Sequence, residues 1–287
     1  MKKYLFLIPT FNDWMSLNLL IQNLDKEFKK NKNNAEVIVV NDCSTQKMTL
    51  NKKKLNCIKN IKILNLRKNV GSQRAIFIGL NYIKERNYRT ILSILDSDGE
   101  DDPTKVNKII KIAEKKRNSI VVANRAKRNE STYLLMLNKL RLFLTYTLTG
   151  KYMNFGNFSA FHTKHLKKML SNNNLRFAYS SGILKNFKNL TYVNINKKER
   201  YYGKSKVNFK FLLEHSLKII CVFKEEIFLR SFFLILILGI INKNYFLESK
   251  LTIFFVILNI FFVTYYLINN SDYNVLKLIK NVKKLKT

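Results

Sequence analysis

The chain has 287 residues, of which 47% are hydrophobic and 25% are charged. This length and balance exclude a mini-protein and argue against a disordered chain. Charge is the outlier, because 52 Lys and Arg residues against 19 Asp and Glu residues give a formal net charge of +33 at pH 7. Nucleic acid, anionic lipid and phosphorylated small molecules are all candidate partners, although a codon bias towards Lys and Asn would produce much of the excess unaided.

Short apolar runs bounded by turn residues occur through the first 123 residues and predict buried strands. The expected strands are Tyr4–Ile8, Glu36–Val40, Ile61–Asn65, Thr90–Leu95 and Ser119–Ala123.

Three longer segments between these runs carry apolar residues at helical spacing: Met15–Lys30, Ser72–Arg86 and Pro103–Lys116. Strands that alternate with helices predict right-handed crossovers and a mostly parallel α/β sheet. Ligands of such sheets bind beyond the carboxyl ends of the strands, where each expected strand is followed by a polar loop.

The cysteines Cys43, Cys57 and Cys221 are odd in number and far apart, which indicates a reducing compartment rather than a disulfide framework.

The last third of the chain carries membrane-type patterns. The uncharged segment Leu251–Ile268 is long enough to cross a bilayer core of about 30 Å. Ile227–Leu247 is a weaker candidate span with Arg230 near one end, and a re-entrant hairpin is its alternative. Two further amphipathic helices, Leu134–Leu148 and Val207–Phe223, are expected to lie on the membrane surface.

These patterns predict a multi-pass chain whose basic segments flank the spans, and basic flanks favour the cytoplasmic side. The predicted divisions are a catalytic domain at 1–206 with an interface helix near 131–149, a juxtamembrane helix at 207–226, two spans at 227–268 and a basic cytoplasmic tail at 269–287.

An acidic segment, Asp96–Pro103, directly follows the fourth expected strand. Carboxylates crowded together repel one another, and a divalent cation would relieve that repulsion. Asp96 and Asp98, two positions apart beyond a strand end, predict ligands for Mg²⁺ or Mn²⁺, with Glu100 as a third. The alternative is an acidic turn that caps the following helix, for which Asp101 or Asp102 alone would be enough.

An Asp-x-Asp loop in a parallel α/β domain is typical of nucleotide-sugar glycosyltransferases, in which the metal neutralises the leaving diphosphate. The chain resembles family 2 glycosyltransferases with the GT-A fold, of the kind that act on dolichyl or other polyprenyl phosphates. The segments that carry the resemblance are Ile8–Asp13, Val39–Thr45, Asn69–Ser72 with Ala75, Asp96–Pro103, Arg125 with Arg128, and Arg200–Lys206.

The resemblance implies roles for individual residues. Asp98 and Arg200 are the expected catalytic residues. The expected donor-binding residues are Pro9, Thr10, Asp13, Asp42 and Asp96, and the expected phosphate-binding residues are Arg125, Arg128, Arg200, Lys204 and Ser205.

One position departs from the resemblance. Gly156-Asn157-Phe158-Ser159 stands where polyprenyl-phosphate enzymes often have Gly-Asp-Phe-Arg. A hydroxyl acceptor needs a positioned base, whereas a phosphate monoester with a second pKa of about 6 is already an anionic nucleophile. The loss of an acidic group at Asn157 is therefore tolerable for a phosphate acceptor, and it also leaves open a different acceptor with its base elsewhere.

The sequence thus predicts a membrane-anchored, metal-dependent, inverting glycosyltransferase that moves a sugar from a UDP- or GDP-sugar to a polyprenyl phosphate at the cytoplasmic face. The resemblance also allows a homo-oligomer. One alternative is transfer to a sugar hydroxyl of a lipid-linked or envelope glycan. A basic nucleic-acid-binding or membrane-scaffold protein is the remote alternative, because the acidic segment lies on the expected ligand edge and no aromatic RNA-binding motif is present.

Overall fold

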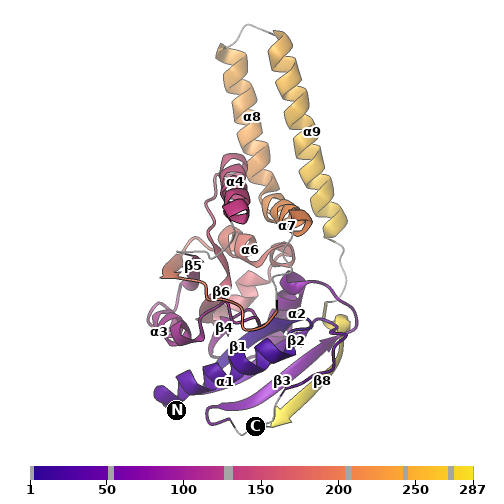
Figure 1. Ribbon diagram of the computed structural model, residues 1–287. Helices are drawn as coiled ribbons and strands as arrows, with labels where there is room; N and C mark the ends of the chain where they lie inside the picture. The colour runs from indigo at the N-terminus through magenta and orange to yellow at the C-terminus, as the bar shows by residue number, and fades with distance from the viewer. Residues whose placement is uncertain are drawn as a thin grey trace. The chain divides into compact units, whose positions relative to one another are not determined.

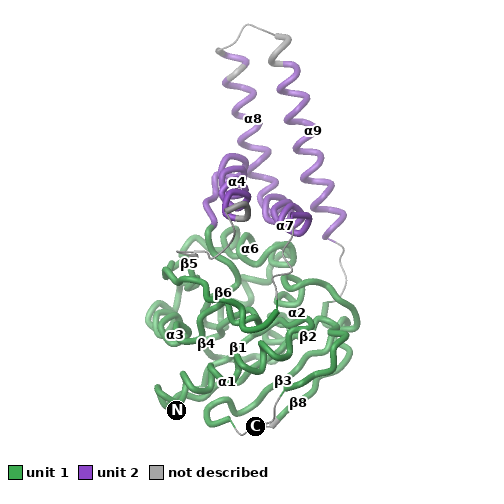
Figure 2. The backbone as a smooth tube through the Cα atoms, viewed as in Figure 1, with its two compact units in different colours: residues 1–129, 154–206, 273–287 green, residues 130–153, 207–272 purple. Residues whose placement is uncertain are grey.

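The computed structural model describes residues 3–50, 55–125, 132–203, 209–241, 245–270 and 275–286. The chain divides into two compact units (Figure 2). Unit 1 comprises residues 1–129, 154–206 and 273–287, and unit 2 comprises residues 130–153 and 207–272.

Unit 1 is built on an eight-stranded sheet in the order β7-β5-β6-β4-β1-β2-β3-β8 (Figure 1). Strands β4, β1, β2 and β3 pair in parallel, as do β5 and β7, whereas β6 and β8 pair antiparallel with their neighbours. The predicted mostly parallel α/β sheet is confirmed. The bounds are β1 (Lys3–Thr10), β2 (Asn34–Asn41), β3 (Ile58–Leu66), β4 (Ile91–Ile94), β5 (Ile120–Arg125), β6 (Phe155–His162), β7 (Leu190–Ile195) and β8 (Ile279–Lys286).

Helices cover both faces of this sheet. Phe6 and Ile8 of β1 belong to a buried core with residues of α1 (Trp14–Lys30) and α3 (Val106–Lys115), which follows a short 3-10 turn, η1 (Pro103–Lys105). On the other face, Gly79 of α2 (Ser72–Glu85) lies so close to Leu7 that a Cβ there would be 2.5 Å from Leu7 Cδ1. Alternation along β1 thus buries both of its faces, as expected of a central parallel strand.

Four further short elements of unit 1 follow β6, and the sequence patterns do not predict them. They are η2 (Thr163–His165), α5 (Leu166–Met169), η3 (Asn174–Arg176) and α6 (Tyr179–Asn186).

The parallel pairing brings the strand ends together at one edge of the sheet. In the β1–β2 register Thr10 lies opposite Asn41, and the Asp42 amide donates to the Thr10 carbonyl oxygen at 2.9 Å. The loops that follow β1, β2 and β4 therefore share one edge, which is where the sequence places its candidate residues.

Unit 2 is helical and contains α4 (Thr132–Thr149), α7 (Phe209–Cys221), α8 (Lys224–Ile241) and α9 (Tyr245–Asn269). Arg230 of α8 donates from Nη1 to the Thr147 carbonyl oxygen at 2.9 Å and so satisfies a backbone group at the end of α4.

Among the described residues, polar side chains of α8 contact α9. Asn259 Nδ2 donates to Ser231 Oγ at 2.8 Å, and Lys224 Nζ lies 3.9 Å from the centre of the Tyr266 ring.

By length and composition, one helix in the described part of the chain, Ser249–Asn269 in α9, is apolar enough to cross a membrane. The two predicted spans are therefore not both confirmed. The first turn of α8 carries the charges of Lys224, Glu225 and Glu226, and Arg230 follows a turn later.

The structure divides the chain differently from the predicted domains in two places. Residues 130–153 belong to unit 2 rather than to the catalytic domain, and residues 273–287 belong to unit 1 rather than to a separate tail. Within that tail, β8 pairs antiparallel with β3, with Lys283 opposite Ile63, and Leu285 packs against the core. Pairing satisfies the backbone groups along the edge of β3, a gain that a lysine-rich segment does not reveal by its composition.

Candidate functional site

The loop after β4, residues 96–102, is called the acidic loop here, and its own backbone shapes it. Asp96 N donates to Asp101 Oδ2 at 3.0 Å, and Glu100 N donates to Asp98 Oδ1 at 3.0 Å. Gly99 adopts φ +85°, and a Cβ at this position would lie 2.4 Å from the Tyr201 ring. Glycine is thus required both by the left-handed backbone and by the close approach of Tyr201.

A distant segment, residues 197–201, lies along the acidic loop and is called the basic segment. Two backbone hydrogen bonds fasten it: Lys198 N donates to the Glu100 carbonyl oxygen and Tyr201 N to the Asp98 carbonyl oxygen, both at 2.9 Å. Lys197 also forms an ion pair with Glu100. The basic segment therefore compensates part of the negative charge of the loop.

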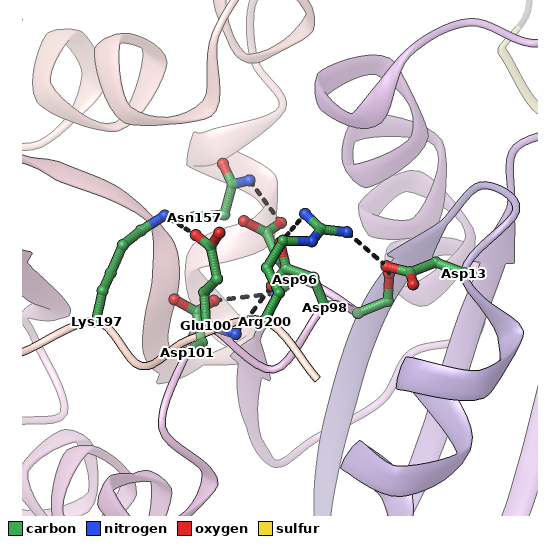
Figure 3. Close-up of polar contacts among 9 residues, drawn as sticks. Asp13, Asp96, Asp98, Glu100, Asp101, Asn157, Lys197 and Arg200 are labelled. Atoms are coloured by element: carbon green, nitrogen blue, oxygen red, sulfur yellow. Dashed lines mark hydrogen bonds and ion pairs between the residues drawn. The ribbon is translucent and has the colours of Figure 1, made fainter. Parts of the chain in front are cut away.

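Arg200, in the basic segment, joins two acidic residues from different loops (Figure 3). Its Nη1 donates to Asp98 Oδ2 at 2.9 Å, and its Nη2 donates to Asp13 Oδ2 at 3.2 Å. Asp13, which precedes α1, also accepts from Ser97 Oγ at 3.3 Å. One guanidinium thus links the loop after β1 to the loop after β4, a geometry that a planar two-pronged cation permits.

Asp96 lies on the other side of the same cluster. Asn157 Nδ2, from β6, donates to Asp96 Oδ1 at 2.9 Å (Figure 3). The residue that replaces an expected acidic group is therefore in direct contact with an acidic residue.

The crowding of carboxylates changes their acidity. Burial, together with the charges of Asp96 and Glu100, raises the pKa of Asp98 to about 6, although Arg200 opposes the shift. Burial and the charge of Asp96 raise the pKa of Asp101 to about 8. Burial and crowding therefore disfavour the fully ionised state of these carboxylates.

The raised pKa of Asp101 predicts that the stability of the fold depends on pH. Because its pKa is about 8 in the folded protein and 3.8 in the reference state, the folded protein holds the proton more tightly, and this contribution to stability is lost as pH rises from about 4 through 8. We expect Asp101→Asn to unfold at a higher temperature than wild type at pH 8.5 in EDTA, with a smaller difference at pH 6. Thermal unfolding at both pH values measures this, and an equal difference at both would contradict it.

The carboxylates of Asp96 and Asp98 are suitable ligands for a hard divalent cation. Asp96 and Asp98 contribute carboxylate oxygens, the ligands that Mg²⁺ and Mn²⁺ prefer. Within the described residues no group of three or more His, Cys, Asp or Glu side chains is placed to hold an ion. The predicted three-carboxylate set is accordingly not assembled, because Glu100 pairs with Lys197. Two carboxylates fit an ion whose other ligands are substrate phosphates.

The residues predicted to bind the sugar donor do not all lie in the cluster around Arg200. Pro9 and Thr10 are buried in β1. Asp42 is 2% exposed, and its carboxylate accepts from Val70 N and Gly71 N, both at 2.8 Å. Burial raises the pKa of Asp42, against the effect of these two amides. Asp42 therefore orders the loop before α2, whereas Asp13 lies in the cluster with Arg200.

Several predicted phosphate ligands lie outside the described residues: Arg128, Lys204 and Ser205. Arg125 ends β5, and its side chain is likewise not described. Of the predicted phosphate-binding set, Arg200 is the member that the described structure brings to the acidic loop.

Two residues in the cluster have no counterpart in the sequence prediction. Lys197 pairs with Glu100, and Gln73 of α2 donates to Asn157 Oδ1 at 3.3 Å. Lys197 lies three residues before the predicted motif Arg200–Lys206, so its place in the sequence could have indicated that it belongs to the site. Gln73 stands beside the predicted Asn69–Ser72 motif, but nothing in its residue type marks its contact.

Comparison with known proteins agrees with this geometry. The family model described as "Glycosyl transferase family 2" matches residues 6–175. A curated relative, the undecaprenyl-phosphate 4-deoxy-4-formamido-L-arabinose transferase of Photorhabdus laumondii, is 24% identical over 216 residues, which cover 74% of this chain and 65% of the relative. The matched region thus spans somewhat less than two thirds of the relative's length.

Among solved structures, glucosyl-3-phosphoglycerate synthase from Mycobacterium tuberculosis, in complex with Mn²⁺, UDP-glucose and phosphoglyceric acid, matches with a TM-score of 0.54. It is 12% identical, and the match covers 79% of this chain and 80% of that chain. At this identity the likeness concerns the fold.

A mostly parallel sheet whose carboxyl edge carries an acidic Asp-x-Asp loop defines an α/β domain of the GT-A kind. The chain belongs to glycosyl transferase family 2, and the predicted family is confirmed.

Proposed function

We propose that this chain is a membrane-anchored, inverting glycosyltransferase that moves a sugar from a UDP- or GDP-sugar to a polyprenyl phosphate. The observation that carries the proposal is the cluster of Asp13, Asp98 and Arg200 at the carboxyl edge of a family 2 sheet. The relative's printed substrate, undecaprenyl phosphate, supports the acceptor class.

On the donor side, Asp96 and Asp98 would hold Mg²⁺ or Mn²⁺, which when bound neutralises charge on the leaving diphosphate. Arg200 lies against Asp98 and supplies a fixed cation beside the same position. A cation oriented before the reaction stabilises the charge that develops on the leaving group.

On the acceptor side, Asn157 cannot remove a proton. A phosphate monoester is largely ionised at neutral pH and requires no base. The amide at Asn157 is therefore compatible with a phosphate acceptor, whereas a sugar hydroxyl would need a base elsewhere. Inversion is what membership of the resembled enzyme group implies.

Chain connectivity limits how the chain could be anchored in a membrane. Strands β1–β7 and β8 belong to one sheet, so residues before 204 and after 278 lie on the same side of any membrane. The chain between them must then cross an even number of times. If α9 crosses, α8 is the helix that precedes it in unit 2 and would supply the second crossing. The contacts Asn259–Ser231 and Lys224–Tyr266 support such an antiparallel pair.

The basic residues near the spans favour a cytoplasmic catalytic unit. Within 15 residues of the end of α9 at Asn269, the chain carries four lysines: Lys277, Lys280, Lys283 and Lys284. Exposed apolar side chains on α4 and α7, such as Phe143 and Phe211, suit an interfacial position.

Transfer by the full chain in detergent tests the proposal. We expect radiolabelled sugar from one of a panel of UDP- and GDP-sugars to pass to undecaprenyl phosphate in the presence of Mn²⁺, giving a lipid product that mild acid hydrolyses. A product stable to mild acid would instead indicate a hydroxyl acceptor. Binding of nucleic acid with steep salt dependence and no nucleotide-sugar binding would contradict the enzyme class altogether.

A further inference from the structure

A chain of three hydrogen bonds connects α6 to the acidic loop. Tyr179 N donates to Gln73 Oε1 at 2.6 Å. Gln73 Nε2 donates to Asn157 Oδ1 at 3.3 Å, and Asn157 Nδ2 donates to Asp96 Oδ1 at 2.9 Å. These residues come from α6, α2, β6 and the loop after β4, and all four lie in unit 1.

The first member of the chain sets the direction of the others. The two ends of a side-chain amide have nearly the same shape, so their assignment depends on the partners. A backbone N–H can only donate, so the oxygen of Gln73 must face Tyr179 and its NH₂ group must face Asn157. The oxygen of Asn157 then faces Gln73, and its NH₂ group faces Asp96. The orientation of Asn157 is thus imposed from the backbone of α6.

We propose that Asn157 is a positioning residue, held by Gln73 so that its NH₂ group orients the Asp96 carboxylate for a divalent cation. The proposal rests on the proposed function only in taking Asp96 as a cation ligand. An Asp at position 157 would instead place a second carboxylate against Asp96, in a loop where Asp98 and Asp101 already crowd it. The amide at position 157 avoids this repulsion.

Two substitutions at Gln73 separate this role from simple packing. In Gln73→Glu, both oxygens accept, so Asn157 must turn its NH₂ group towards position 73 and its oxygen towards Asp96. In Gln73→Met, the contact with Asn157 is lost, but Asn157 stays free to donate to Asp96. Glu has nearly the shape of Gln, so a packing role predicts that Met is the more harmful change.

The measurement is the affinity of the full chain for Mn²⁺ alone, in detergent, from electron paramagnetic resonance of the free ion. Partners that orient metal ligands typically contribute about 10- to 100-fold in affinity. We expect at least a tenfold loss in Gln73→Glu, and no more than about a threefold loss in Gln73→Met. Gln22→Glu, on α1, controls for the added charge.

A second variant tests the coupling directly. Adding Asn157→Ala to Gln73→Glu removes the wrongly turned amide oxygen and should restore part of the lost affinity. Unfolding temperatures of all variants establish that they are folded.

Equal losses in Gln73→Glu and Gln73→Met, no recovery in the double variant, or a wild-type chain that does not bind Mn²⁺ would each overturn the proposal. Sugar transfer is not the readout, so a failure to glycosylate polyprenyl phosphate would contradict the proposed function and leave this result standing.

Discussion

Asp98→Asn should lower kcat for sugar transfer by about 10²- to 10³-fold, the loss typical when one stabilising group is removed from a transition state. Asp98 accepts from Arg200 Nη1 through Oδ2 and from Glu100 N through Oδ1. An Asn in the same position can still accept from Glu100, but it presents either a neutral oxygen or an NH₂ group to the guanidinium. The charge that would bind both Arg200 and a divalent cation is lost, while the shape is kept.

The fold should survive this change. Burial and neighbouring carboxylates already penalise the charge of Asp98, as its pKa of about 6 indicates, so a neutral amide removes repulsion as well as an ion pair. We expect an unfolding temperature within a few degrees of wild type.

Asp102→Asn is the matched control for this experiment. Asp102 Oδ1 accepts from Thr104 N at 2.9 Å as the cap of the following turn, and Asn is an equally good cap. Its kcat should stay within about threefold of wild type. Full transfer by Asp98→Asn in the presence of a chelator would remove Asp98 from the mechanism.

The strands and the acidic loop could be predicted because their signals are local. Runs such as Tyr4–Ile8 are apolar on both faces, as a buried parallel strand must be, and the loop after Leu95 concentrates acidic residues within seven positions. Family 2 motifs in the right order then placed Arg200 among the site residues, and in the structure it contacts Asp98.

What escaped prediction depends on partners far away in the sequence. The lysine-rich composition of β8 predicts a basic tail. The structure pairs β8 with β3 instead, through backbone hydrogen bonds that composition does not reveal. Asp42 is predicted to bind the donor, which stays a prediction, and the structure adds that its oxygens accept from Val70 and Gly71. In each case the residue type was informative, but the partner could be identified only from the fold.

Arg200→Lys should reduce transfer by about 100-fold, although the positive charge is kept. Arg200 reaches Asp98 at 2.9 Å and Asp13 at 3.2 Å with two different nitrogens of one rigid plane. A lysine ammonium is a single point of charge and cannot hold both carboxylates in this geometry. The loops after β1 and β4 would lose their common link, and one carboxylate would be left without its cation in a poorly hydrated position.

A split between kinetic constants identifies what Arg200 does. If it stabilises charge that develops on the leaving diphosphate, kcat should fall with little change in the KM for the donor, whereas loss of a ground-state contact would raise KM alone. Lys198→Gln is the control, because Lys198 is half exposed and pairs with Asp102 at 3.0 Å rather than with Asp98 or Asp13. An Arg200→Lys enzyme with half or more of the wild-type kcat would show that a point charge is sufficient and that the bridge to Asp13 has no part in transfer.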